Sequence, residues 1–88
     1  MLKDKIIVIT GGLGLLGKSL AESLVKDNAT VILLDIKNKK SLFEVNDYQK
    51  IKDKLYYFKC DVSNYSQVKQ ISKLIMKKFS KINVLINN

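Results

Sequence analysis

The chain has 88 residues, of which 47% are hydrophobic and 27% charged, which is the composition of a globular chain rather than a disordered one. Its apolar runs are too short for a membrane-spanning helix, and no secretory leader follows Met1. The net charge of +8 comes from lysines spread along the chain without any arginine, so we expect a solvated surface and no nucleic-acid or membrane partner.

The first predicted elements form a strand–helix–strand unit. Residues 5–10 are rich in β-branched side chains and apolar on both faces, which predicts a buried strand. Leucines at every fourth position predict a helix over residues 15–27, with Asn28 as a left-handed cap after its end. Residues 30–36 predict a second buried strand, which such a crossover makes parallel to the first.

The second half of the chain continues the alternation. Residues 37–54 are polar and weakly periodic, and predict a loop followed by a modest helix. Residues 55–62 predict a third strand, and Asn64 is expected to cap the next helix with Gln67 as its capping-box partner. Residues 82–86 predict a fourth strand. The apolar stripe of the helix before it consists of Val68, Ile71, Ile75 and Phe79.

This order of elements predicts the fold class. The pattern β-α-β-α-β-α-β is the first half of a Rossmann-like, doubly wound α/β fold with a parallel sheet. We therefore expect residues 1–88 to be one partial NAD(P)-binding Rossmann domain, truncated after its fourth strand.

A glycine-rich loop between the first strand and the first helix carries the chemistry. Gly12, Gly14 and Gly17 fit the spacing G-x-G-x-x-G, and the strand before and the helix after them make the pattern specific. Glycines there allow a sharp turn, close approach of a pyrophosphate to the backbone, and close packing of helix on sheet. Exposed amides and the helix dipole then hold the phosphates. We expect a bulky residue at Gly12 to block binding by filling the space that the phosphate needs.

Asp35 ends the second strand and predicts the choice of cofactor. A carboxylate at this position can accept both ribose hydroxyls of an adenosine. It also repels a 2′-phosphate, since like charges about 4 Å apart cost about 4 kcal/mol at an effective dielectric constant of about 20. The sequence therefore favours NAD over NADP, although lysines just beyond Asp35 could soften the repulsion. The alternative is that Asp35 only starts a turn.

With these residues in view, the whole chain resembles the N-terminal half of the short-chain dehydrogenase/reductase family. The resemblance rests on four segments: Thr10-Gly11 to Gly17, Asp35, Cys60-Asp61-Val62 and Leu85-Ile86-Asn87-Asn88. It implies that Asp61 and Val62 contact adenine and that Asn88 lies beside a cofactor ribose. Taken alone, Asp61 would be an ordinary turn residue. The expected cofactor-binding residues are Gly11, Gly12, Gly14, Leu16, Gly17, Asp35, Asp61, Val62 and Asn88.

The loop departs from the usual short-chain pattern in one position. T-G-x-x-x-G-x-G would place a glycine where this chain has Leu15, and the middle glycine is Gly14 instead. The resulting T-G-x-x-G-x-x-G is typical of the extended branch of the family, which holds sugar-nucleotide epimerases and dehydratases. The first hypothesis is therefore an NAD(P)-dependent oxidoreductase transferring hydride between the cofactor and an alcohol or carbonyl compound. An extended-type epimerase or dehydratase, or a nucleotide-binding module without catalysis, are the alternatives.

No catalytic or metal-binding residue is expected within the chain. In the family that it resembles, the catalytic Ser and Tyr-x-x-x-Lys lie beyond residue 88. Tyr48 and Tyr65 have a lysine four residues later, but both belong to segments expected on the adenosine side, away from a nicotinamide. With sixteen lysines in the chain, such matches arise by chance.

Three further expectations concern the cellular compartment, the partners and the stability of the protein. The single cysteine, Cys60, cannot form an internal disulfide, which favours a cytoplasmic protein. The complete protein is expected to be a homo-oligomer that binds a dinucleotide and a small-molecule substrate. The 88 residues alone are expected to be inactive and poorly stable, because the fourth strand would be a sheet edge that has lost its covering helices.

Overall fold

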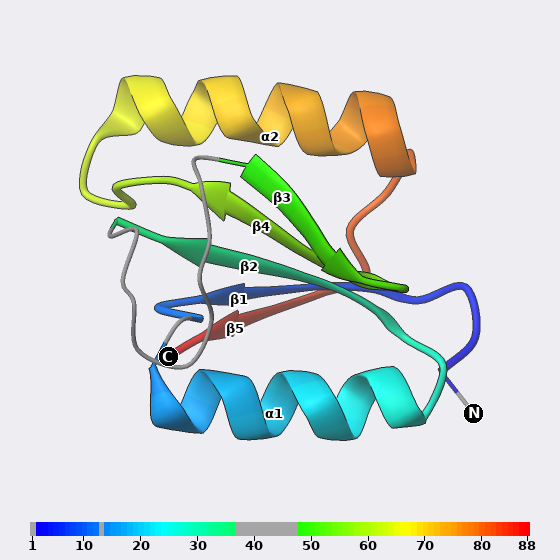
Figure 1. The fold of residues 1–88 in the computed structure, drawn as a ribbon. Coiled ribbons are helices and arrows are strands. Elements are labelled where there is room, and N and C mark those ends of the chain that lie inside the picture. The colour runs from blue at the N-terminus through cyan, green and yellow to red at the C-terminus, as the bar shows by residue number, and fades with distance from the viewer. Residues whose placement is uncertain (1, 13, 37–47) are drawn as a thin grey trace.

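A computed structural model describes residues 2–12, 14–36 and 48–88. One mostly parallel sheet runs through these residues, in the strand order β3-β4-β2-β1-β5, with helix α1 on one face and helix α2 on the other (Figure 1). Neither helix within these described residues is long and apolar enough to cross a membrane. The elements are β1 (Ile6–Thr10), α1 (Leu15–Lys26), β2 (Thr30–Asp35), β3 (Tyr48–Lys52), β4 (Leu55–Lys59), α2 (Tyr65–Phe79) and β5 (Val84–Asn87).

Alternate residues of the central strands supply two separate cores, because successive side chains of a strand point to opposite faces. The core under α1 consists of Ile7, Ile9, Ala21, Ala29, Val31, Leu33, Leu55 and Tyr57. The core under α2 consists of Ile6, Val8, Ile32, Leu34, Phe58, Cys60 and Ile75. The predicted stripe of α2 is confirmed, since its other three members, Val68, Ile71 and Phe79, pack against this second core.

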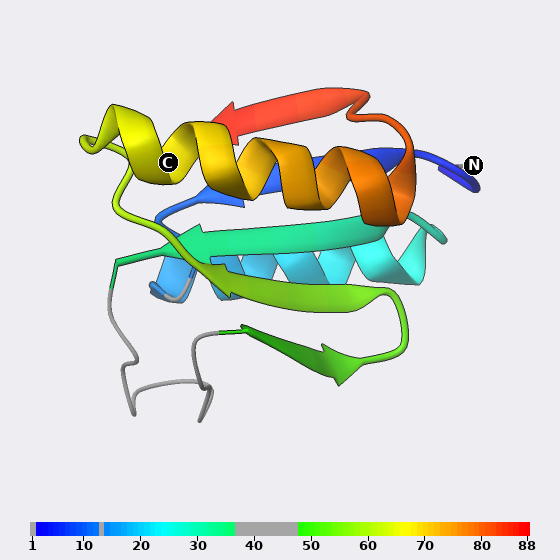
Figure 2. The same ribbon diagram turned by 90° about the horizontal axis from the view of Figure 1, so that it is seen from above.

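The doubly wound α/β prediction is confirmed by the pairing of the strands. β1 pairs in parallel with β2 on one side and with β5 on the other, and β2 pairs in parallel with β4 (Figure 2). Helix α1 is the crossover from β1 to its parallel neighbour β2, and helix α2 carries the chain from β4 across the sheet to β5 on the other side of β1. The two crossovers run in opposite directions along the sheet, so the helices lie on opposite faces (Figure 1).

The helix predicted late in residues 37–54 is wrong over residues 48–52, which form strand β3. This strand pairs antiparallel with β4, and the two are joined by a two-residue turn of Asp53 and Lys54. Lys54 adopts a left-handed conformation (φ 64°), as a tight hairpin turn demands. Pairing with the open edge of β4 outweighs the weak helical periodicity of the segment. The rest of that prediction, residues 37–47, lies outside the described residues.

The helix caps follow the prediction in part. Asn28 is left-handed (φ 72°) just after α1, as predicted. The Asn64 side chain accepts a hydrogen bond from the Gln67 backbone N–H (3.1 Å), which confirms it as the N-cap of α2. The capping box is wrong in its second half, because the Gln67 side-chain oxygen accepts from the backbone N–H of Asp61 (2.9 Å). The Asn64 N–H instead donates to the Asp61 carbonyl (2.9 Å), and this hydrogen bond closes the turn before α2.

Two predicted strands differ from the observed ones at their ends. The third predicted strand, residues 55–62, stops at Lys59, because the chain turns from Asp61 toward α2. The fourth begins at Val84 rather than at residue 82. Asn83 prolongs its pairing with β1: the Ile6 N–H donates to the Asn83 side chain and the Asn83 N–H donates to the Ile6 carbonyl, both at 2.8 Å.

Candidate functional site

The predicted site residues come together at one edge of the sheet. Because β1, β2, β4 and β5 are parallel, their carboxyl ends meet at the same edge, on the left of Figure 1. The glycine loop follows β1, Asp35 ends β2, Asp61 follows β4, and Asn88 follows β5. In open α/β sheets this edge is where ligands bind.

Three of the four glycines are required by the protein itself. Gly11 is left-handed (φ 62°), and a Cβ on it would stand 3.1 Å from the Asn88 carbonyl oxygen. A Cβ on Gly12 would stand 2.8 Å from Leu33, and one on Gly17 would stand 2.7 Å from the Gly12 carbonyl oxygen. The glycines therefore let the loop turn off β1, lie flat on β2 and receive α1 at close range, which agrees with the predicted turn and packing roles.

Gly14 differs because the space beside it is open. A Cβ there would meet only the Gly11 carbonyl oxygen, at 3.6 Å, which is an ordinary contact. Gly14 is also the N-cap of α1, makes no side-chain cap, and has no acidic residue in the turn that follows it. Leu15 and Leu16 in that turn are 77% and 61% exposed. The positive end of the helix dipole is thus accessible to an anion.

The prediction for Gly12 is corrected by the same geometry. The space that a side chain at Gly12 would fill is already occupied by Leu33 and the Ile9 carbonyl, beneath the loop rather than on its open side. A bulky residue at Gly12 would therefore damage the packing of the loop. The open side of the loop lies at Gly14, where a Cβ would have room.

Hydrogen bonds from the end of β5 fix the glycine loop. The Asn88 backbone N–H donates to the Thr10 hydroxyl (3.2 Å), and its side-chain amide donates to the Gly11 carbonyl (3.2 Å). The Thr10 hydroxyl donates in turn to the Ile86 carbonyl (3.4 Å). Asn88 therefore lies beside the loop, and its expected place beside a cofactor ribose stays a prediction. Thr10 was missed as a site residue, although its place directly before Gly11 was a usable signal.

Asp35 stands next to this loop at the end of β2. The Gly12 N–H donates to the carbonyl of Leu34, the neighbour of Asp35 (3.0 Å), and the Asp35 carbonyl accepts from the Cys60 N–H (2.8 Å). The Tyr57 hydroxyl also donates to the Asp35 carbonyl (3.4 Å). The end of β2 is thus held on one side by the glycine loop, through Leu34, and on the other by the segment from β4 to Cys60, through Asp35.

Asp61 takes part in a turn, the alternative role considered for it. Its Oδ1 accepts from the Ser63 hydroxyl (2.6 Å) and from the Ser63 N–H (2.9 Å). These two hydrogen bonds, the hydroxyl's first, hold the pKa of Asp61 below its ordinary value. Burial, and secondarily the charge of Asp61, raise the pKa of the Cys60 thiol. A buried thiol of raised pKa is a poor nucleophile, so Cys60 is a core residue.

A hollow of about 270 Å³ opens beside these residues, between α2 and the sheet. It is mainly apolar, and Val62, which is 52% exposed, lies on its lining together with Thr10 and Asn87. Thr10 and Asn87 were not predicted there. Their inclusion depends on the pairing of β1 with β5, which brings residues far apart in sequence to one end of the sheet.

A sequence model described as short chain dehydrogenase matches residues 5–88. The chain belongs to the short-chain dehydrogenase family. This is a family of oxidoreductases that use nicotinamide cofactors, and the resemblance inferred from the glycine loop and the double asparagine is confirmed.

Individual relatives agree with this assignment. The chain is 34% identical over 88 residues to a diacetyl reductase, (S)-acetoin forming, of Staphylococcus epidermidis, covering 97% of this chain and 33% of the relative. It superimposes on a short chain dehydrogenase of Bacillus anthracis with a TM-score of 0.82 and 27% identity, over 100% of this chain and 35% of that one. A short chain dehydrogenase of Leptospira borgpetersenii, solved with bound NAD⁺, gives a TM-score of 0.78 and 27% identity, over 98% and 31%. The chain spans about a third of the length of the relatives it matches.

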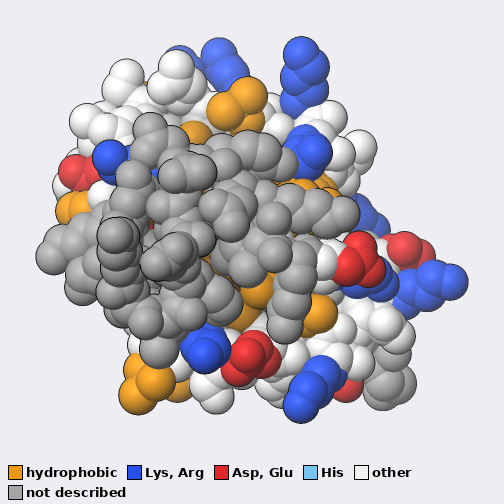
Figure 3. Space-filling view, viewed as in Figure 1, with side chains coloured by type: hydrophobic (Ala, Val, Ile, Leu, Met, Phe, Trp, Pro, Cys, Tyr) orange, Lys and Arg blue, Asp and Glu red, His pale blue; other side chains and the backbone are white. Residues whose placement is uncertain are grey.

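Three further features of this short-chain dehydrogenase chain concern the Tyr-x-x-x-Lys spacings, metal binding and the distribution of lysines. Tyr48 and Lys52 lie on a strand rather than on a helix, and Tyr65 is 78% exposed at the start of α2. Within residues 2–12, 14–36 and 48–88, no three His, Cys, Asp or Glu side chains gather as metal ligands. The lysines visible in Figure 3 are scattered over the face in view and do not form one patch.

Proposed function

We propose that residues 1–88 form part of the NAD(P)-binding Rossmann domain of an oxidoreductase that transfers hydride between a nicotinamide cofactor and an alcohol or carbonyl compound. The observation that carries the proposal is the contrast among the glycines. Gly11, Gly12 and Gly17 are packed against the protein, whereas Gly14 faces open space at the N-terminus of α1. That arrangement suits a pyrophosphate, whose charge the free amides and dipole of α1 favour.

Each remaining site residue has a role in this proposal. The amides around Gly14 and Leu16 hold the pyrophosphate, and the Asp35 carboxylate accepts the ribose hydroxyls of the adenosine. Asp61 and Val62 border the adenine, where the half-exposed Val62 offers an apolar contact. Asn88 borders the second ribose and keeps the loop in place through Gly11. When bound, the nicotinamide supplies the hydride chemistry, and we assign no catalytic residue within the chain.

NAD rather than NADP is the cofactor that this proposal favours, because Asp35 would repel a 2′-phosphate. The relatives reported above are reductases and dehydrogenases, so they lend no support to an epimerase or to a module without catalysis. Homo-oligomeric assembly and a cytoplasmic location stay predictions.

The phosphate cradle is tested by substitution at its open glycine. Gly14→Val in the protein should weaken NAD binding by about tenfold or more, because the isopropyl group occupies the pyrophosphate position. Calorimetric titration of NAD measures the affinity, and the exposed Ser19→Val on the same helix is the matched control. Wild-type affinity in Gly14→Val would refute the cradle.

The cofactor preference is tested at the end of β2. Asp35→Ala should lower the ratio of the NADP dissociation constant to the NAD dissociation constant by about tenfold or more, because the repulsion of the 2′-phosphate is removed. Competition between the two cofactors measures the ratio directly, and Asp35→Asn separates charge from size. An unchanged ratio in both variants would mean that Asp35 is only a turn residue.

A further inference from the structure

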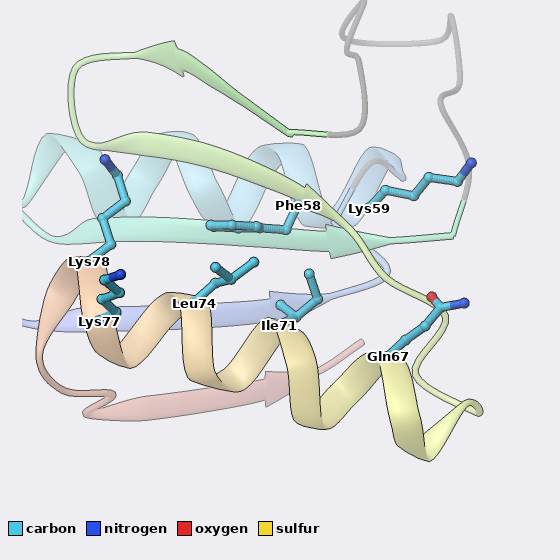
Figure 4. A pocket seen from close by; sticks show the side chains of 7 residues that line it. All are labelled: Phe58, Lys59, Gln67, Ile71, Leu74, Lys77 and Lys78. Carbon is cyan, nitrogen blue, oxygen red and sulfur yellow. The ribbon is translucent and has the colours of Figure 1, made fainter.

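A second hollow lies between β4 and α2, outside the glycine loop and its neighbours. Its volume is about 790 Å³, within the range of roughly 300–1,000 Å³ typical of small-molecule sites. In Figure 4 the side chains of Phe58 from β4 and of Ile71 and Leu74 from α2 point toward one another along its middle. The residues that line it are Phe58, Lys59, Gln67, Ile71, Leu74, Lys77 and Lys78.

The hollow has an apolar middle and lysines at both ends: Lys77 and Lys78 at one, and Lys59 at the other, where its side chain points away from the middle (Figure 4). Leu74 is 48% exposed, so its side chain lies open to an occupant. Lys77 and Lys78 stand together at the end nearest the C-terminus of α2 (Figure 4). The Lys78 ammonium lies 5.6 Å from the centre of the Tyr56 ring and 5.8 Å from that of Phe79, contacts that hold it near the hollow.

The positive charge of α2 favours an occupant with a negative charge. The helix carries four lysines, Lys69, Lys73, Lys77 and Lys78, and no acidic residue. An apolar surface with two neighbouring cations at one end complements a molecule with an apolar body and an anionic head. A free anion would gain nothing from Phe58, Ile71 and Leu74, and a cationic amphiphile would be repelled by the lysine pair.

We propose that this hollow is a binding site for a small anionic amphiphile, an acyl or alkyl chain with a carboxylate or phosphate head. The apolar chain lies between Phe58 and Leu74, and the head lies at Lys77 and Lys78. The hollow shares Ile71 with the smaller hollow beside Val62, but none of the proposed cofactor-binding residues lines it, so it is distinct from the proposed cofactor site.

Octyl phosphate is a suitable probe, titrated calorimetrically into the protein below the concentration at which it forms micelles. We expect saturable binding, with inorganic phosphate and octyltrimethylammonium each at least about tenfold weaker. Lys77→Gln/Lys78→Gln should weaken octyl phosphate about fivefold. Leu74→Asn should weaken it about tenfold through the lost apolar contact.

Two control variants match these changes on the same helix. Lys69→Gln/Lys73→Gln removes the same charge from residues outside the hollow, and Met76→Asn replaces another half-exposed apolar side chain. Both controls should bind octyl phosphate within about twofold of wild type. All four variants should keep wild-type NAD affinity, so that failure here is distinguishable from failure of the cofactor proposal.

Several results would overturn the site. One is the absence of saturable octyl phosphate binding. Another is that inorganic phosphate binds as tightly as octyl phosphate, which would indicate that the lysines bind the phosphate group without help from the apolar residues. Equal weakening in the test and control pairs would indicate non-specific attraction to the charge of α2. Circular dichroism on each variant identifies loss of folding. Leu74→Asn and the lysine pair change different parts of the hollow, so if one variant does not fold, the other still tests the site.

Discussion

Gly12 lies so close to β2 that a Cβ added to it would stand 2.8 Å from both Cβ and Cδ2 of Leu33. Leu33 is fully buried in the core under α1, so it has little freedom to move aside. Gly14, two residues on, has no such neighbour. The two glycines look alike in the motif, but one serves packing and the other leaves room for a ligand.

Gly12→Ala should lower the free energy of unfolding by about 1–3 kcal/mol, because the added methyl group overpacks the loop against Leu33. Gly14→Ala should cost less, about 0.5 kcal/mol, because its backbone is extended and its Cβ has room, so that only the lower preference of alanine for an N-cap counts. Urea denaturation followed by circular dichroism compares the two. Similar losses at both positions would contradict the packing role of Gly12.

The sequence was sufficient to find the loop, but not to assign its glycines. The spacing of Gly12, Gly14 and Gly17 indicated a dinucleotide loop, and Asp35 and Asn88 fell at the same edge of the sheet. What a Cβ added to each glycine would contact depends on β2 lying beneath the loop and on Asn88 lying beside it. Those are tertiary contacts between distant residues, so no local pattern encodes them.

At the level of elements, the start of α2 depends on the residue that precedes it and caps it. Asn64 caps the helix, and the Asp61–Ser63 turn before it is held by the Gln67 side chain. Asn64→Ala should therefore destabilise the protein by about 1 kcal/mol, the usual cost of losing an N-cap. Thermal and urea unfolding measure it, with the exposed Gln70→Ala on the same helix as control.

A loss in Gln70→Ala equal to that in Asn64→Ala would show that alanine itself, rather than the missing cap, is responsible.

The α2 cap was predictable because Asn64 and Gln67 are neighbours in sequence. Strand β3 was not, because what makes residues 48–52 a strand is the free edge of β4, with which Tyr48, Gln49 and Lys50 pair. A short polar segment has no strong preference of its own, and the neighbouring edge decides its structure.

For the molecule as a whole, the sheet is unequally covered. β1 and β2 are buried, whereas β5 exposes 44% of Val84 and 57% of Leu85, and among the described strands it pairs with β1 alone. An exposed apolar edge strand is a template for pairing with another chain. We therefore expect the 88-residue chain to self-associate as its concentration rises, despite its net charge of +8.

Leu85→Lys should reduce that self-association, because a charged side chain on an edge strand opposes pairing with a second edge. Sedimentation velocity over a concentration series gives the monomer fraction, and Met76→Lys, which adds the same charge on α2, is the control. An equal reduction in both variants would assign the effect to net charge rather than to β5.

The hydrogen bond from Asn88 to Gly11 joins residues 77 positions apart. A ribosome adding roughly 5–20 residues per second takes roughly 4–15 s to proceed from one to the other. During that interval the nascent glycine loop lacks the partner that holds Gly11, and contacts of such separation are the slow ones in folding. The loop that begins near the start of the chain is therefore among the last parts of it to mature.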